Sequence, residues 1–108
     1  MNFDDTFSIG QFVKKMRVDK LETLHQVSKG TDIDMTMLSK IERADRLPTN
    51  EQAEKIAKYF RVSEDEFKTK LTAERIIKEY GINETTFNAI KLLGEQLATY
   101  LNNKNNAI

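Results

Sequence analysis

The side chains most able to do chemistry lie between Thr23 and Arg46, a segment whose pattern predicts two short helices joined by a tight turn. In the second of these helices, Leu38 and Ile41 are three residues apart and point inward, which leaves the rest of its surface open. The open surface carries Met35, Thr36, Ser39, Lys40 and Arg43. Amine, guanidinium and hydroxyl groups on one helix face are hydrogen-bond donors suited to the DNA major groove.

This segment, TDIDMTMLSKIERADRLP from Thr31 to Pro48, resembles the Cro/phage-repressor type of helix-turn-helix, also called the xenobiotic-response-element-like family. The run LSKIER from Leu38 to Arg43 is the most specific part. The resemblance extends without a gap over Ile9-Gly10, Arg17, Thr23–Ser28, Pro48–Phe60 and Val62–Phe67. Together with AERIIKEYG further along, the segment also resembles small bacterial regulators found near restriction–modification genes.

The resemblance implies an all-α fold, a five-helix lambda-repressor-like DNA-binding bundle with an additional C-terminal helix. Helical signals dominate the chain, and no segment shows a sustained alternating pattern typical of strands. We expect the DNA-binding domain at residues 1–70 and a C-terminal helical extension, with a frayed polar tail, at residues 71–108.

Capping signals place the ends of the expected helices. The first helix is predicted over residues 6–19. Thr23 with Gln26 predicts a capping box for the second, and Asp34 the N-cap of the third, at about residues 34–43. Asp32 stands where the family usually has a turn glycine, which an aspartate can replace in the left-handed conformation. The remaining predicted caps are Thr49 with Gln52, Ser63 with Glu66, and Asn83 after a stop at Gly81.

Met35, Thr36 and Lys40 occupy the positions that match the base-contacting face of the family. Lysine can donate to guanine O6 and N7, threonine can bond to either partner, and methionine can touch a thymine methyl group. A solvent-exposed surface lysine is the alternative for Lys40. Met37 is a further possible DNA contact, or else a residue half buried against the preceding helix.

Four residues are predicted to contact DNA phosphates: Thr23, Ser39, Arg43 and Arg46. Thr23 begins a helix whose amide groups and dipole favour an anion, although its hydroxyl also suits a plain cap. Arg43 and Arg46 lie beside Glu42 and Asp45, so a local ion pair is the competing interpretation. Phosphate contacts fix the register of a protein on DNA and carry little sequence information.

Arg17 and Glu42 are expected to form a structural ion pair that ties the first helix to the third, as the matching residues do in the family. Glu42 is therefore assigned to structure and not to acid–base chemistry. Breaking such a pair costs ~3–5 kcal/mol where it is well buried.

Composition and charge limit how the chain can bind DNA and where in the cell it is expected. Lys plus Arg and Asp plus Glu both number 17, so the net charge is zero. Between Lys14 and Arg46 there are eight basic and six acidic residues, which predicts weak non-specific attraction to DNA. No apolar run reaches the ~20 residues of a membrane helix, and no signal peptide precedes the first helix, so we expect a cytoplasmic protein.

The sequence offers no signal of enzyme chemistry. There is no cysteine and a single histidine, His25, so neither a zinc site nor a nucleophile–base pair is predicted. The carboxylates are scattered, and no glycine-rich phosphate loop occurs. We expect no catalytic residue, no metal and no cofactor.

The principal hypothesis is a transcriptional regulator that binds a palindromic double-stranded DNA operator as a homodimer. The dimer or partner surface is predicted on the last two helices, at Leu71, Ile77, Phe87, Ile90, Leu93 and Leu97. These apolar residues could equally pack back onto the bundle. The alternative function is an antitoxin or adaptor whose C-terminal helices bind another protein.

Overall fold

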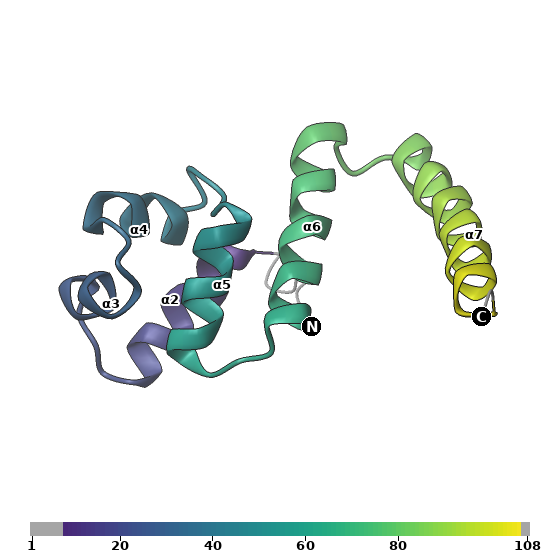
Figure 1. The fold of residues 1–108 in the computed structure, drawn as a ribbon. Coiled ribbons are helices and arrows are strands. Elements are labelled where there is room, and N and C mark those ends of the chain that lie inside the picture. The colour runs from purple at the N-terminus through teal and green to yellow at the C-terminus, as the bar shows by residue number, and fades with distance from the viewer. Residues whose placement is uncertain (1–7, 107–108) are drawn as a thin grey trace. The chain divides into compact units, whose positions relative to one another are not determined.

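The computed structural model describes residues 8–106, and all regular secondary structure in this range is helical (Figure 1). The predicted all-α class is therefore confirmed. The helices are α2 (Ile9–Asp19), α3 (Leu24–Thr31), α4 (Met35–Glu42), α5 (Asn50–Phe60), α6 (Glu64–Tyr80) and α7 (Glu84–Asn106). The chain divides into two compact units that meet between Arg75 and Ile76, so α6 contributes to both.

The predicted capping residues begin the helices as expected. The Thr23 hydroxyl accepts a hydrogen bond from the Gln26 amide at 3.1 Å, and the Gln26 side-chain oxygen accepts one from the Thr23 amide at 2.8 Å. Thr49 and Gln52 form the same reciprocal box at the start of α5. Each box satisfies two amide groups that lack a partner within the helix, which fixes the helix start.

The outer ends of the helical region differ from the sequence prediction. The expected start at Thr6 lies outside the described residues, and α2 begins at Ile9 with Ser8 as its cap. The last helix was expected to fray over residues 102–108, but α7 runs to Asn106. Asparagine costs less than ~0.7 kcal/mol per helical position relative to alanine, so nothing in this polar stretch stops the helix.

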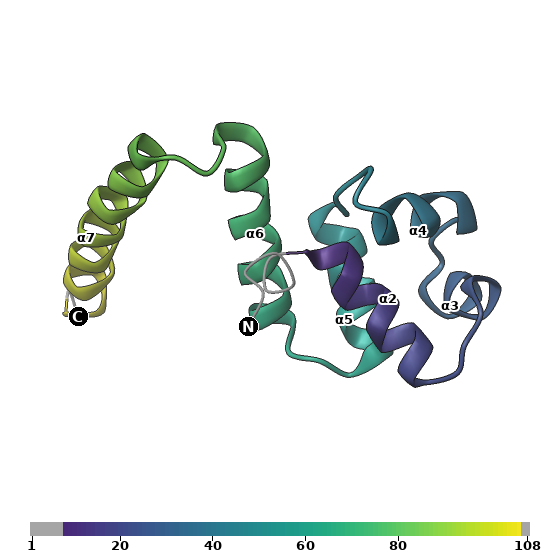
Figure 2. The ribbon, with the colours of Figure 1, turned by 180° about the vertical axis from the view of Figure 1, so that it is seen from behind.

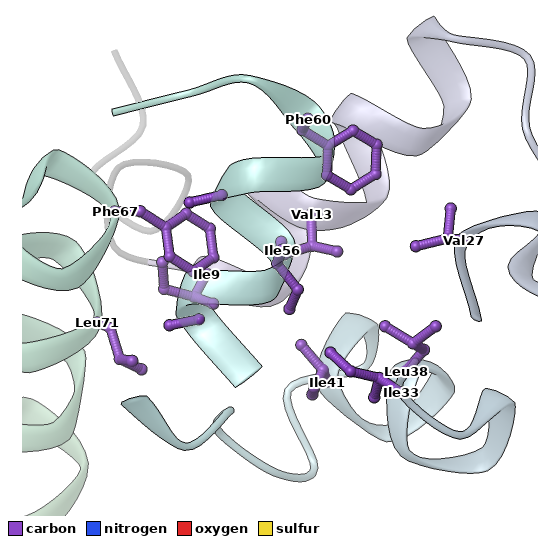
Figure 3. Packing of buried hydrophobic residues seen from close by; sticks show 12 residues of the cluster. Ile9, Val13, Val27, Ile33, Leu38, Ile41, Ile56, Phe60, Phe67 and Leu71 are labelled. Atoms are coloured by element: carbon purple, nitrogen blue, oxygen red, sulfur yellow. The ribbon is translucent and has the colours of Figure 1, made fainter. Parts of the chain in front are cut away.

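The first unit encloses one hydrophobic core (Figure 3). Helix α4 packs against α2 and α3 (Figure 2). Helix α3 also packs against α5. The buried residues come from all five helices and from the turn before α4: Ile9, Val13, Val27, Ile33, Leu38, Ile41, Ala53, Ile56, Ala57, Phe60, Phe67 and Leu71.

Two glycines allow helices of the first unit to approach closely. A Cβ atom on Gly10 would lie 2.2 Å from the carbonyl oxygen of Ile41, and one on Gly30 would lie 1.9 Å from the ring of Tyr59. Both distances are far shorter than any real carbon contact. The absence of a side chain at Gly10 therefore positions α2 against the end of α4, and its absence at Gly30 positions α3 against α5.

Helix α6 is bound to the first unit as far as Arg75. Phe67 and Leu71 lie in the core. The Glu74 carboxylate accepts a hydrogen bond from the Ile9 amide at 2.7 Å, where a negative charge suits the N-terminus of α2. Arg75 donates to the Pro48 carbonyl at 2.9 Å. These bonds join α6 to the start of α2 and to the loop that follows α4.

The prediction that Leu71 belongs to a dimer or partner surface is wrong. Leu71 is fully buried inside the first unit. Its helical spacing from Phe67 indicated an apolar stripe correctly, but the stripe alone does not say which element covers it. The core of the bundle covers Phe67 and Leu71.

The second unit comprises the end of α6 and the whole of α7. Gly81 separates the two helices with φ of 85°, a left-handed conformation that glycine adopts without strain. The Asn83 side chain then accepts a hydrogen bond from the Thr86 amide at 2.9 Å and begins α7. The large apolar side chains of α7 are all exposed.

Candidate nucleic-acid interface

A tight three-residue turn, residues 32–34, joins α3 to α4. Asp32 adopts the left-handed conformation with φ of 58°, and its amide donates to the Ser28 carbonyl at 2.9 Å. Ile33 is buried in the core, and the Asp34 carboxylate accepts from the Thr36 amide at 3.4 Å. The turn therefore has the geometry that the sequence predicts, with aspartate in place of the expected glycine.

Helix α4 presents its apolar side to the core and its polar side to solvent. Leu38 and Ile41 are buried. Met35, with 42% of its surface exposed, and Thr36 lie on the open side. Lys40 is half-buried, and a lysine can cover its aliphatic stem while its amine stays in solvent. Of the three predicted base-contacting residues, Met35 and Thr36 are thus exposed and Lys40 is partly exposed.

Met37 differs from these three residues. It is half-buried and packs against the hydrophobic core. A methionine that fills space between α4 and its neighbours has less surface to offer a ligand than Met35 has. The core-packing interpretation that the sequence left open for Met37 therefore accounts for its position.

Three of the residues around the end of α4 form a small polar cluster. Arg43 donates to the Ser39 hydroxyl at 2.6 Å and to the Asp45 carboxylate at 3.0 Å. The side chains of Arg43 and Asp45 are each 58% exposed, and an exposed ion pair contributes ~0–1 kcal/mol. The local ion pair is thus present, and it is weak enough for another anion to replace it.

Thr23 and Arg46 lie at the two ends of the helix-turn-helix segment and are both exposed. The Thr23 hydroxyl already accepts the Gln26 amide of its capping box. Its proton remains available for donation, because a hydroxyl group can donate and accept at once. Arg46 follows a turn in which its amide reaches back to the Lys40 carbonyl at 3.3 Å.

A buried ion pair ties α2 to α4. Arg17 donates to both carboxylate oxygens of Glu42, at 2.7 and 3.0 Å, and its third contact is the Glu22 carbonyl at 2.9 Å. Their side chains are only 16% and 7% exposed. The hydrogen bond to Glu42 raises the pKa of Arg17. This bidentate ion pair is the structural pair that the resemblance implies. It holds the C-terminal end of α4 against α2.

A second hydrogen bond holds the loop between α2 and α3 to α5. The Tyr59 hydroxyl donates to the Glu22 carboxylate at 2.7 Å, while the ring of Tyr59 lies over Gly30. The bond to Glu22 raises the pKa of Tyr59. Glu22 therefore connects α2 with α5, because its carboxylate binds Tyr59 and its carbonyl accepts a hydrogen bond from Arg17.

Sequence reasoning missed these supporting residues. Gly10 lies inside the first predicted helix, where glycine is unfavourable, and that cost is a signal of close approach. Gly30 stands where the second helix is predicted to end, but α3 continues to Thr31. Nothing in the local pattern pairs Glu22 with Tyr59, since 37 positions separate them.

The remaining residues of the predicted partner surface lie in the second unit. Ile77 is half-buried, whereas Phe87, Ile90, Leu93 and Leu97 are between 43% and 66% exposed. The structure therefore keeps four of the six predicted residues exposed on α7, leaves Ile77 half-buried on α6, and buries Leu71 in the core.

The fold and this accessible helix define a helix-turn-helix protein, and comparison with known proteins agrees. A family profile described as helix-turn-helix matches residues 13–67, more than half of the chain. The chain belongs to the helix-turn-helix family of the Cro/phage-repressor type. Searches of curated proteins and of solved structures gave no significant match.

Family membership makes the chain a DNA-binding transcriptional regulator. Within residues 8–106, no helix is both long and apolar enough to cross a membrane. In the same range, no group of three or more histidine, cysteine, aspartate or glutamate residues is arranged to hold a metal ion.

Proposed function

We propose that the chain binds a palindromic operator as a homodimer, with α4 of each copy in the major groove of one half-site. The observation that supports a homodimer is the distribution of exposed apolar side chains between the two units. Of twelve large hydrophobic side chains exposed among the described residues, nine belong to the second unit. Large exposed apolar side chains that gather in one part of a folded chain favour a protein partner.

Three side chains of α4 are proposed to contact bases. Lys40 donates to guanine O6 and N7, Thr36 bonds to a neighbouring base, and Met35 contacts a thymine methyl group. Their accessibility supports these roles, as does the opposite position of Leu38 and Ile41 in the core. Met37 becomes a secondary candidate because its side chain packs on the core.

Phosphate contacts are proposed for Thr23, Ser39, Arg43 and Arg46. The exposed pair between Arg43 and Asp45 is replaced on DNA by a pair between Arg43 and a phosphate. Such contacts set the register of α4 in the groove. With no net charge on the chain, we expect few of them and weak retention of unrelated DNA.

A dimer with two-fold symmetry reads an operator with two-fold symmetry. The two copies of α4 then reach half-sites whose centres are about 34–36 Å apart or a multiple of that distance. Membership of the restriction–modification controller branch stays a prediction that rests on resemblance.

The test is selection of genomic fragments by the purified protein at low salt, repeated at physiological salt. We expect one inverted repeat that survives the higher salt. On that DNA, Lys40→Ala weakens binding by about 10- to 100-fold, the cost of one good base contact. Lys58→Ala is the matched control, because it removes the same charge from an exposed position on α5.

Two outcomes contradict the proposal. The first is recovery of salt-sensitive bulk DNA only. The second is an equal loss of binding for Lys40→Ala and Lys58→Ala, which would indicate general electrostatics and not recognition through α4.

The adaptor or antitoxin function is the second candidate, and the exposed apolar face of α7 is the observation that favours it. The two candidates differ in what the first unit does. Joint Lys40→Ala and Arg43→Ala substitution abolishes biological activity if the chain is an operator-binding regulator. An adaptor that acts through α7 keeps its activity and its melting temperature.

A further inference from the structure

Gly94 is the one glycine among the described residues for which the fold gives no internal reason. Gly10 and Gly30 allow close contacts, and Gly81 has a positive φ angle. Gly94 lies in the middle of α7, and a Cβ atom added there would meet nothing within 4 Å. Glycine destabilises an exposed helix interior relative to alanine. Close approach of a second chain is the physical circumstance in which this cost is offset.

Gly94 also lies within the apolar face of α7. Alternating steps of three and four residues place it on one side of the helix with Phe87, Ile90, Leu97 and Leu101. The four side chains are between 43% and 66% exposed and surround the bare backbone of Gly94. Such an arrangement leaves a gap bounded by large apolar groups, in which the backbone of a facing helix can approach closely.

The charges of α7 indicate what faces it. The helix has four charged residues, Glu84, Lys91, Glu95 and Lys104, so its net charge is zero. A helix lying on a membrane surface is typically rich in lysine and arginine, which α7 is not. Glu84 and Lys104 lie ten residues on either side of Gly94. An antiparallel second copy brings these opposite charges level, whereas a parallel copy brings like charges level.

We propose that α7 pairs with α7 of a second copy in antiparallel orientation, and that the two helices cross at Gly94. The inference rests on the homodimer of the proposed function and specifies its interface. In this arrangement Phe87 of one copy lies level with Leu101 of the second copy. The helix dipoles also oppose each other, which is favourable for neighbouring antiparallel helices.

A groove beside α7 extends the same interface. It has a volume of about 550 Å³ and lies between the end of α6 and the first half of α7, lined by Ile76, Tyr80, Ala89, Ile90 and Leu93 together with Asn83, Thr85 and Thr86. The crossing at Gly94 places Tyr100 of the second copy level with residue 88, next to this groove. An aromatic ring with a hydroxyl suits an apolar groove with a few polar groups at its wall.

The apolar face of α7 carries several large side chains that a dimer would bury. A stable interface buries ~1,200–2,000 Å² in total, or ~600–1,000 Å² per copy. An aromatic side chain alone buries ~150–250 Å² when fully covered. Phe87, Tyr100 and the leucines of the face are all more than half exposed, so each can contribute to an interface of this size.

Cysteine cross-linking tests the orientation directly, because the chain has no cysteine of its own. Phe87→Cys and Leu101→Cys proteins are mixed in equal amounts and oxidised in a glutathione buffer. The expected product is the mixed disulfide, in at least fivefold excess over both homodisulfides. Leu92→Cys is the control: Leu92 is as exposed as Leu97 but points away from Gly94, so it yields no cross-linked dimer.

Gly94→Leu provides an independent measurement. A bulky side chain at the crossing raises the dimer dissociation constant at least tenfold, while the helical content of the chain is unchanged. The proposal is overturned if homodisulfides dominate, if Leu92→Cys cross-links equally well, or if Gly94→Leu leaves the dissociation constant unaltered.

The number of unmodified chains per selected operator separates this inference from the proposed function. Two chains on the operator without the mixed disulfide overturn the antiparallel α7 pair alone. A single chain on the operator overturns the homodimer, and with it the inference.

Discussion

The two units of this chain differ in how far each buries its own apolar side chains. In the first unit, twelve apolar residues are buried together, and the close approaches at Gly10 and Gly30 are met by Ile41 and Tyr59. In the second unit, the apolar face of α7 is open and Gly94 meets nothing. The difference indicates that the first unit is complete as a monomer, while the second unit is shaped for a partner.

The largest effect is expected from Arg17→Ala, which breaks the support between α2 and α4. The change leaves the buried Glu42 carboxylate without its cation, so we expect a loss of about 3 kcal/mol in the free energy of unfolding. Chemical denaturation measures it. Lys15→Ala, in the same helix, breaks an exposed pair with Asp19 and is expected to cost less than ~0.5 kcal/mol. Equal losses for both variants would contradict the structural role of Arg17.

A pair of glycine substitutions compares the two units directly. Gly30→Ala forces the Tyr59 ring aside and is expected to destabilise the first unit by about 2 kcal/mol. Gly94→Ala meets no atom of its own chain and raises helix propensity by ~0.5–1 kcal/mol. Thermal melting of both variants, made at a concentration where the protein is monomeric, gives opposite shifts. Destabilisation of the monomer by Gly94→Ala would show that the second unit packs within its own chain.

Tyr59→Phe is expected to have a smaller effect, because it removes one hydrogen bond and keeps the ring over Gly30. We expect a loss of about 1 kcal/mol at neutral pH. The bond to Glu22 raises the pKa of Tyr59 above its usual value of 10.0. A raised pKa contributes stability below the unfolded value and loses it as the pH rises through the folded value. As the pH rises, the difference in stability between the two proteins should therefore shrink only above about pH 10. A stability difference that already shrinks between neutral pH and about pH 9 would contradict the bond.

The smallest effect is expected from Asp45→Asn, which releases Arg43 from its exposed ion pair. Stability should change by less than ~0.5 kcal/mol, since both side chains are largely solvated. Binding to operator DNA should strengthen by about two- to fivefold, because one negative charge near the phosphates is lost. DNA titration at fixed salt measures the change. Weaker binding would mean that Asp45 positions Arg43 for its phosphate.

The fold was predictable from the sequence where local signals decide the structure. The caps at Thr23 and Asp34 fix the ends of α3 and α4, and the spacing of Leu38 and Ile41 fixes the buried side of α4. The tight turn was predictable too, because only Ile33 separates the turn residue Asp32 from the cap at Asp34. The exposure of Met35 and Thr36 follows from this spacing, whereas the proposal that Met35, Thr36 and Lys40 contact bases rests on the resemblance to the family.

Contacts between distant segments were not predictable in the same way. The sequence shows that Phe67 and Leu71 form an apolar stripe, but only the three-dimensional structure shows that the bundle covers this stripe. The contact of Gly30 with Tyr59 joins positions 29 apart, and no local pattern encodes it. The pair formed by Arg17 and Glu42 was available in advance only because the chain resembles a known family.

The most direct test of a DNA-binding dimer held by the second unit is the number of chains on the selected operator, measured by sedimentation for a matched pair of variants. Leu92→Lys and Leu97→Lys change leucines that are equally exposed, at 56%, on different faces of α7. We predict two chains per operator for the unaltered protein and for Leu92→Lys, and about 100-fold weaker binding with loss of the second chain for Leu97→Lys. Two chains bound equally tightly by Leu97→Lys, or one chain bound by the unaltered protein, would contradict the account.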